Sequence, residues 1–162
     1  MKHLKDILIS IAIIAVLIGI DQITKVIAFK HLEEGVTIKA IPHLFKFILV
    51  RNDGAAFSML EGKQWLFYII TILALFGFGF LMKDCDFVKL PIYTISLCLV
   101  ISGTIGNFID RLIFGSVRDF VTFDFMSFAV FNFADMCLTV GVIMLIIDFI
   151  FGATGKLWTK SS

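Results

Sequence analysis

The residues best suited to chemistry are two aspartates in apolar surroundings, Asp119 in GSVRDFV and Asp135 in FNFAD. A carboxylate at the centre of a membrane helix costs roughly 2.5 to 3.5 kcal/mol on insertion scales. When two carboxylates lie close together, their repulsion raises one pKa, so the pair can hold a single proton. Such a pair can activate water without a metal, because one member accepts a proton while the other donates one. The sequence therefore predicts acid–base chemistry at these two positions.

Other polar side chains stand at helical spacing within apolar segments. Asp21 and Lys25 are four residues apart, so a helix places them on one face, either as a buried ion pair or as support for a site. Asn107, Asp110 and Arg111 have i, i+3 and i+4 spacing and would also share a face. They fit either a polar helix end that meets water or a group of side chains turned into a helix bundle.

Asn132 precedes Asp135 by three residues, which is the spacing of a helix N-cap and an acid in the first turn. The helix dipole favours an acid at that place. Capping alone is a sufficient interpretation of Asn132. It is a poorer interpretation of Asp135, because Asp135 lies inside an apolar run.

Other catalytic arrangements have little support. The three histidines are scattered and form no zinc-binding HExxH motif, and no serine stands in a nucleophile-elbow pattern. Cys85, Cys98 and Cys137 have neither disulfide nor metal-site spacing, so we expect them to be packing residues. We expect Asp148 to be a surface charge near the membrane interface opposite to the aspartate pair.

The composition indicates which elements must position these residues. The chain is 59% hydrophobic and 17% charged and has 19 phenylalanines in 162 residues, which is more apolar surface than a soluble domain of this length could bury. A net charge of +1 gives no basic footprint for nucleic acid. Four apolar stretches are long enough to span a bilayer, at about Ile7–Phe29, Trp65–Met82, Leu90–Ile109 and Phe131–Phe151. We expect a single integral membrane domain over residues 1–162, an all-α four-helix bundle.

Four spans place both termini on one side of the membrane, and the loops at about 31–64 and 110–130 on the other. Every polar cluster described above then lies near that second side. Basic residues near the span ends discriminate weakly between the two orientations. We expect both termini to be cytoplasmic, which makes the loop at 31–64 extracytoplasmic and the loop at 110–130 an extracytoplasmic catalytic loop.

The loop at 31–64 carries strand signals. Val36, Ile38 and Ala40 alternate with polar residues, and Leu44–Val50 is rich in β-formers and is followed by the turn signal Asn-Asp-Gly. We therefore expect a small extracytoplasmic β-sheet after the first helix.

Five motifs in order resemble the lipoprotein signal peptidases, also called signal peptidase II. They are DQITK from Asp21, RNDGAAF from Arg51, GNFIDR from Gly106, RDF from Arg118 and FNFAD from Phe131. Their order, their spacing and the four-span layout match this family over nearly the whole chain. The resemblance implies an aspartic endopeptidase of the bacterial cytoplasmic membrane. It would cut prolipoproteins just before a diacylglyceryl-modified cysteine, near the outer leaflet, as a monomer among membrane lipids and with no cofactor or metal.

The resemblance also implies roles for individual residues. Asp119 and Asp135 match the catalytic pair of the family. Residues that match positions lining or supporting the site are Asp21, Lys25, Asn52, Gly54, Asn107, Asp110, Arg111, Asn132 and Ala134. Arg118 departs from the pattern, because the family usually has an apolar residue before the first aspartate. Its guanidinium would either lower the pKa of Asp119 or point to lipid headgroups.

Two other classes of function compete with the peptidase. A small proton- or ion-coupled transporter component could use intramembrane charges as a relay, although the polar groups gather at one face and do not continue across the membrane. A non-enzymatic scaffold could use the same groups to hold its helices together. Cleavage of a diacylated precursor in the presence of a metal chelator would separate the three.

Overall fold

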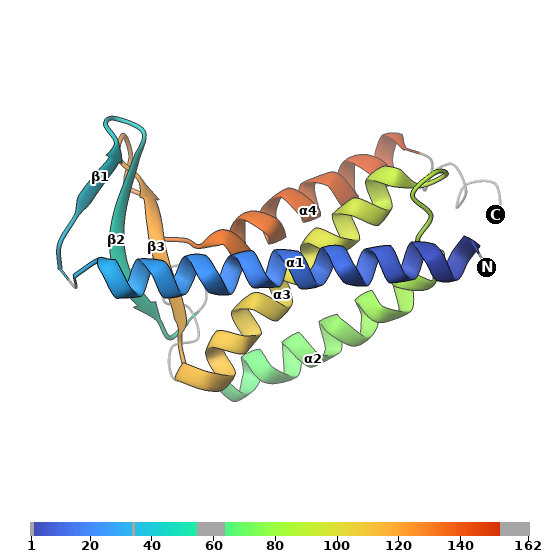
Figure 1. Ribbon diagram of the computed structural model, residues 1–162, viewed down its shortest axis with the longest axis horizontal. Coiled ribbons are helices and arrows are strands. Elements are labelled where there is room, and N and C mark those ends of the chain that lie inside the picture. Colours follow the sequence, from blue (N-terminus) through green and yellow to red (C-terminus); the bar gives the residue numbers. More distant parts are fainter. Residues whose placement is uncertain (1, 34, 55–63, 153–162) are drawn as a thin grey trace.

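The computed structural model describes residues 2–33, 35–54 and 64–152. Its elements in chain order are α1 (Lys2–His31), β1 (Ile38–Ile41), β2 (Phe45–Asn52), α2 (Gln64–Leu81), the short 3-10 helix η2 (Met82–Asp84), α3 (Pro91–Phe114), β3 (Val117–Phe123) and α4 (Phe133–Phe151). Figure 1 shows the sheet at one end of the helices, and the start of α1 with the end of α4 at the other. The fold class predicted from the sequence is confirmed.

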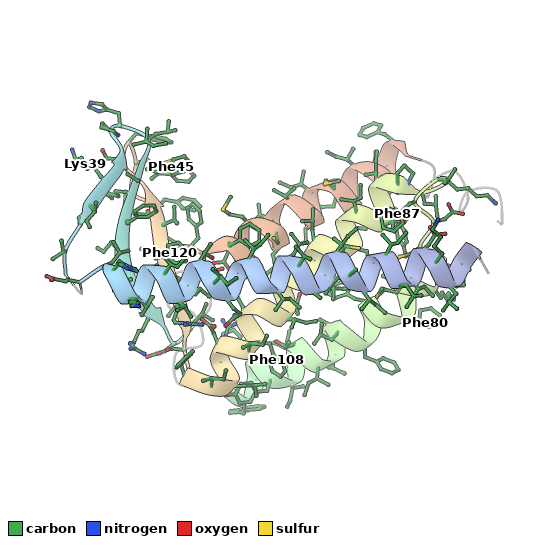
Figure 2. The ribbon with its side chains drawn as sticks, in the orientation of Figure 1. Lys39, Phe45, Phe80, Phe87, Phe108 and Phe120 are labelled. Carbon is green, nitrogen blue, oxygen red and sulfur yellow. The ribbon has the colours of Figure 1, made fainter. Side chains whose placement is uncertain are left out.

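Four helical segments are long and apolar enough to cross a membrane: His3–His31, Trp65–Asp84, Pro91–Phe114 and Phe133–Phe151. Many of their large apolar side chains face outward, for example Leu73 at 65% and Phe76 at 80% exposure. A soluble protein rarely exposes so many, whereas a bilayer solvates them. Figure 2 places the labelled Phe80 on α2, at a distance from Phe45 on the sheet.

Helix α3 lies at the centre of the bundle. In its most apolar window, 61% of the residues are buried, whereas none is buried in the corresponding window of α2. Pro91 stands in the first turn, where its missing N–H costs nothing, and Gly115 ends the helix at a φ of 73° that favours glycine. The core around α3 contains Cys85, Cys98 and Leu97, so the packing role predicted for two of the cysteines is confirmed.

Glycines set the distance between α3 and α4. A Cβ atom on Gly103 would overlap the carbonyl oxygen of Ala134, and one on Gly141 would come within 2.7 Å of a Val100 methyl carbon. The two helix backbones therefore pack closely at both places, as small residues allow in membrane bundles. This contact fixes the first turn of α4, which carries Asp135.

The sheet is antiparallel, with the strand order β1-β2-β3. The pairing of β2 with β3 places Val50 opposite Asp119, and Asn52 opposite Val117. The sequence predicted the first two strands but treated 110–130 as a loop. Part of that range is helical, since α3 continues to Phe114, and part is β3. The third strand was missed because polar residues stand on both of its faces and its partner lies far away in sequence. Residues 55–57 of the RNDGAAF motif lie outside the described residues.

Candidate active site

Asp119 lies in β3 with 1% of its surface exposed. Its two carboxylate oxygens accept hydrogen bonds from separate amides. Asn52 Nδ2 donates to Oδ2 at 3.0 Å, and Asn132 Nδ2 donates to Oδ1 at 2.6 Å. Burial, followed by the neighbouring charge of Asp135, raises the pKa of Asp119 to about 7, although the two amide donors act in the opposite direction. A carboxyl with this pKa can hold a proton near neutral pH.

Asp135 lies in the first turn of α4. Asn132 is the N-cap of that helix, and the two residues form a reciprocal capping box. The Asn132 side chain accepts from Asp135 N at 3.0 Å, and Asp135 Oδ2 accepts from Asn132 N at 3.0 Å. Asn107 Nδ2 donates to the other carboxylate oxygen at 2.7 Å. The capping expected from the sequence is therefore present, but it occupies only one oxygen of Asp135.

Two asparagines connect the aspartates. Asn132 Nδ2 donates both to Asp119 and, at 3.0 Å, to Asn107 Oδ1. Asn107 in turn donates to Asp135, so the four side chains form one chain of hydrogen bonds from β3 to α4. Asn107 Oδ1 also accepts a hydrogen bond from Lys25 Nζ at 3.0 Å. Because a lysine can only donate, the atom facing Lys25 must be the amide oxygen of Asn107, and the atom facing Asp135 must be its NH₂ nitrogen. Both carboxylates are therefore held by asparagines whose own amide groups are fixed by further hydrogen bonds.

A buried ionic network lies directly behind this chain. Lys25 is fully buried, 2.9 Å from Asp21 Oδ2 and 3.6 Å from Asp110 Oδ2. Asp21 Oδ1 accepts a hydrogen bond from the backbone N–H of Ala134 at 2.9 Å, so α1 is tied to the first turn of α4. The pair thus combines both interpretations that the sequence allowed, a buried ion pair and a contact with the helix that carries Asp135.

Arg118 points away from Asp119, because successive side chains of a strand face opposite sides of a sheet. Its guanidinium binds Asp110 through two contacts, Nε at 3.1 Å and Nη2 at 2.8 Å, and its backbone N–H donates to the same carboxylate at 2.9 Å. The Arg118 side chain also stacks on the ring of Phe114. Neither of the two roles expected for Arg118 is found, because its partner is a buried acid on α3.

Gln22 belongs to this network and was missed by the sequence analysis. Its Nε2 donates to Asp21, Asp110 and the Gly106 carbonyl, and its Oε1 accepts from Arg118 at 2.9 Å. The available signal was its place in DQITK, next to Asp21. Because Gln22 carries no charge and does not share the helical spacing of Asp21 and Lys25, the charge pattern gave no reason to select it.

Arg111 closes the other side of the site. Its Nη2 donates to the Gly54 carbonyl at 3.2 Å, and its guanidinium lies over the ring of Phe67. Gly54 N–H donates to Asn52 Oδ1 at 3.1 Å, and this bond holds the asparagine that contacts Asp119. Arg111 therefore links α3 to the segment that follows β2.

A cleft of about 1180 Å³ opens beside the two aspartates. The sheet and α4 supply most of its walls, and the lining is mainly apolar. Polar groups in the lining include Asn52, Asp53, Asp119 and Asp135, and the apolar lining includes Phe45, Phe47, Phe123, Phe128, Phe131, Met136, Leu138 and Val140. This is a pocket with a few convergent polar groups, which is the usual form of a binding or catalytic site.

The structure brings all the predicted site residues together. They come from α1, the end of β2, α3, β3 and the start of α4, and each is connected to the aspartate pair through the contacts described above. Within the described ranges, no three His, Cys, Asp or Glu side chains are grouped so that they could hold a metal ion. Asp148, expected to be a surface charge, is instead 4% exposed and lies at the other end of α4.

The chain is similar in sequence to lipoprotein signal peptidases. A family model described as signal peptidase (SPase) II matches residues 13–151. A lipoprotein signal peptidase of Lactiplantibacillus plantarum is 42% identical over 139 residues, 86% of this chain and 92% of that protein. One from Streptococcus agalactiae is 46% identical over 132 residues, 81% of this chain and 84% of that protein.

Two solved structures of bacterial membrane enzymes have a similar fold. A bacterial membrane enzyme determined by the in meso method at 2.3 Å resolution superposes with a TM-score of 0.82 at 35% identity, covering 91% of this chain and 90% of that one. A second, determined at 1.9 Å, gives 0.79 at 35% identity, with 88% and 92% covered. Together with the four apolar helices, these matches describe a multi-pass bacterial membrane protein. The chain belongs to the signal peptidase II family of lipoprotein signal peptidases.

Proposed function

We propose that this protein is an aspartic endopeptidase that removes signal peptides from prolipoproteins, cutting before a diacylglyceryl-modified cysteine with Asp119 and Asp135 as its catalytic pair. The observation that carries the proposal is the hydrogen-bonded chain that orients both carboxylates beside a mainly apolar cleft. Membership of the family supplies the substrate class. The aspartic mechanism is inferred from the arrangement of the two side chains.

In the proposed mechanism, the pair shares one proton. Asp119 holds it below a pH of about 7, because its pKa is raised to that value. Asp135, ionised, takes a proton from a water molecule while the resulting hydroxide attacks the scissile carbonyl carbon. Asp119 donates its proton to the carbonyl oxygen. The tetrahedral intermediate then collapses: one of its hydroxyl protons returns to Asp119, the C–N bond breaks, and the proton held by Asp135 passes to the departing amine of the lipidated cysteine.

The surroundings suit a lipid-modified peptide. The apolar residues of the cleft can receive acyl chains, while β2 and the segment after it can hold the peptide backbone. Asn52, Gly54 and Arg111 stand at that edge and are proposed to position the substrate next to Asp119. We place the cleft at the outer leaflet, with both termini in the cytoplasm, and the active unit is proposed to be the monomer.

The test is cleavage of a synthetic diacylated precursor peptide by the purified protein in detergent with a metal chelator present. We expect a single cut before the lipidated cysteine, located by mass spectrometry. Asp119→Asn and Asp135→Asn should each lower kcat by at least about 10³-fold, the scale on which catalytic groups contribute. Both variants should still unfold cooperatively on heating.

Asp124→Asn is the matched control. Asp124 lies at the tip of the sheet, where it pairs with Lys39 at 3.8 Å, and it takes no part in the aspartate network. This variant makes the same chemical change and should cleave at the rate of the unaltered protein. Normal processing by either Asp119→Asn or Asp135→Asn, or a requirement for a metal, would refute the proposed mechanism.

A further inference from the structure

A second pocket lies at the end of the bundle opposite to the sheet. It has a volume of about 810 Å³ and is bounded by the start of α1, the turn from η2 into α3, and the last turns of α4. Figure 1 shows these three segments together near the end of α4. Its lining includes Asp6, Asp84, Tyr93 and Asp148 beside apolar residues such as Phe149. The catalytic site described above uses none of these residues.

Asp148 is the unusual member of this lining. Only 4% of the residue is exposed, and in the part of the chain that the structure describes its buried Oδ2 has no hydrogen-bond partner. A buried carboxylate oxygen without a donor is costly, and a cation brought into the pocket would remove that cost. Asp6, in the same lining, is 7% exposed. The pocket therefore favours the binding of a positively charged group.

The two lysines in the lining do not neutralise Asp148. Lys83 Nζ lies 3.7 Å from the centre of the Phe80 ring, and Lys89 is exposed. Asp86, also in the lining, accepts hydrogen bonds from two backbone N–H groups of the turn that follows it. Four aspartates against two lysines leave the lining net acidic. No ion pair between these lysines and Asp148 is found among the described residues.

An exposed apolar face of α4 runs from Asp135, in the lining of the first cleft, toward the second pocket. Counting from Asp135, residues Val142, Ile146 and Phe149 follow at helical spacing, and they are 44%, 53% and 61% exposed. Asp148 is 13 residues after Asp135, which corresponds to about 20 Å along the helix axis. Asp148 itself lies about 140° around the helix from this face, turned toward the bundle, but Ile146 and Phe149 also line the acidic pocket, so a partner along this face would have one end near the aspartate pair and the other at that pocket.

Signal peptides have matching dimensions. They begin with a positively charged segment, continue with 7 to 15 apolar residues and end at the cleavage site. As a helix, the apolar part is about 10 to 22 Å long. We propose that the pocket around Asp148 binds a Lys or Arg side chain from the basic N-terminal segment of the precursor, while the scissile bond lies at Asp119 and Asp135. This inference rests on the proposed function.

The length match favours a peptide over other cations. A metal ion or the amine of a lipid headgroup would also compensate Asp148, but neither carries an apolar segment whose length matches the distance between Asp148 and the aspartate pair. In the peptide interpretation, α4 sets the distance between the bound basic end and the bond that is cut.

The test compares two synthetic diacylated precursors that differ only in the N-terminal segment, one with lysines and one with glutamines in their place. With the unaltered enzyme, we expect kcat/KM to be about tenfold lower for the glutamine precursor, mainly through KM. With Asp148→Asn, the two precursors should differ by less than twofold. Asp148→Glu keeps the charge and should keep most of the discrimination. If Asp148→Asn discriminates as strongly as the unaltered enzyme, the inference is wrong.

Controls separate this inference from the proposed function. Asp124→Asn removes one carboxylate at the sheet end and should preserve the tenfold discrimination. If the unaltered enzyme cleaves neither precursor, the proposed function fails. If it cleaves both with equal kcat/KM, only the inference fails. Thermal unfolding of Asp148→Asn confirms that the compared proteins are folded.

Discussion

At the scale of single residues, the site depends on how amide donors are distributed between two carboxylates. Asp119 receives its two hydrogen bonds from side-chain amides, whereas Asp135 receives one from Asn107 and one from the backbone of its own cap. Asp119 is nearly inaccessible, and Asp135 is half-buried. The two carboxyls therefore differ in surroundings, as paired acids with different roles do.

The pH dependence of cleavage follows from Asp119. A carboxyl whose pKa is raised to about 7 is protonated below that pH and loses its proton above it, so kcat/KM should decline as the pH rises through about 7. The amide of Asn52 favours the ionised form. Asn52→Ala should therefore move the alkaline limb upward by about one pH unit, the shift given by a hydrogen bond of about 1.5 kcal/mol to a charged group.

The pH–rate profile of Asn52→Ala distinguishes this role from a structural one. If Asn52 only shapes the cleft, kcat/KM would fall uniformly and the alkaline limb would stay in place. A limb that moves to lower pH would contradict the assigned direction.

Arg118 is expected to contribute to stability. Arg118→Met removes the guanidinium from a carboxylate that is fully buried, and breaking a buried pair in this way costs about 3 kcal/mol or more. Thermal unfolding in detergent should show a melting temperature lower by several degrees. Lys39→Gln is the control, since the Lys39 side chain is 64% exposed and its pair with Asp124 should contribute less than about 1 kcal/mol. Equal melting temperatures for Arg118→Met and the unaltered protein would contradict this account.

At the scale of elements, the relation of α3 to α4 positions the pair. Asn107 on α3 reaches Asp135 only because Gly103 and Gly141 allow the two helices to approach closely. The sheet contributes Asp119 by a different route, since β3 follows directly after α3 and pairs with β2. Helix α2 has no fully buried residue in its apolar window, although Leu75 and Phe78 are partly buried against the core.

Gly103→Ala tests the close approach. Its new Cβ would overlap the Ala134 carbonyl, so α4 must shift and both the melting temperature and kcat should fall. Gly77→Ala is the matched control on α2, where a Cβ meets nothing within 4 Å. That variant should keep full activity and be slightly stabilised by its better helix propensity. Full activity of Gly103→Ala would show that α4 tolerates the shift.

The sequence predicted the elements better than their contacts. Apolar length identified all four helices, because a bilayer imposes that length on each span independently. The strand β3 was missed because its pairing with β2 is a contact across more than sixty residues. The partner of Arg118 was missed for a related reason: Asp110 is eight residues away, and only the turn between α3 and β3 brings the two side chains together. The burial of Asp148 depends on α1 and α3, which no local pattern reveals.

At the scale of the whole molecule, the sheet lies at one end of the helices, and the segments that line the acidic pocket lie at the other (Figure 1). The aspartate pair lies at the sheet end, where β3 and the first turn of α4 meet. A signal peptide that spans the bilayer would pass both ends. The molecule as a whole thus has the dimensions needed to hold such a substrate across the membrane.

The orientation can be tested by labelling. Lys39→Cys places a thiol on the sheet, and Lys89→Cys places one near the opposite end, both at exposed positions. In intact spheroplasts, a membrane-impermeant maleimide should label the first variant but not the second, which should react only after permeabilisation. The three native cysteines are buried and give a low background. Labelling of Lys89→Cys alone in intact cells would reverse the proposed orientation.

The ion pair within α1 has a consequence for how the protein enters the membrane. Asp21 and Lys25 are neighbours on one helix, 2.9 Å apart, so each neutralises the other without help from any later segment. During synthesis, α1 leaves the ribosome long before α3 supplies Asn107 and Asp110 or α4 supplies the Ala134 N–H. The first helix can thus be inserted with its two charges already paired, before the helices that later contact it are synthesised. The aspartate pair is assembled only when the last helix has been made.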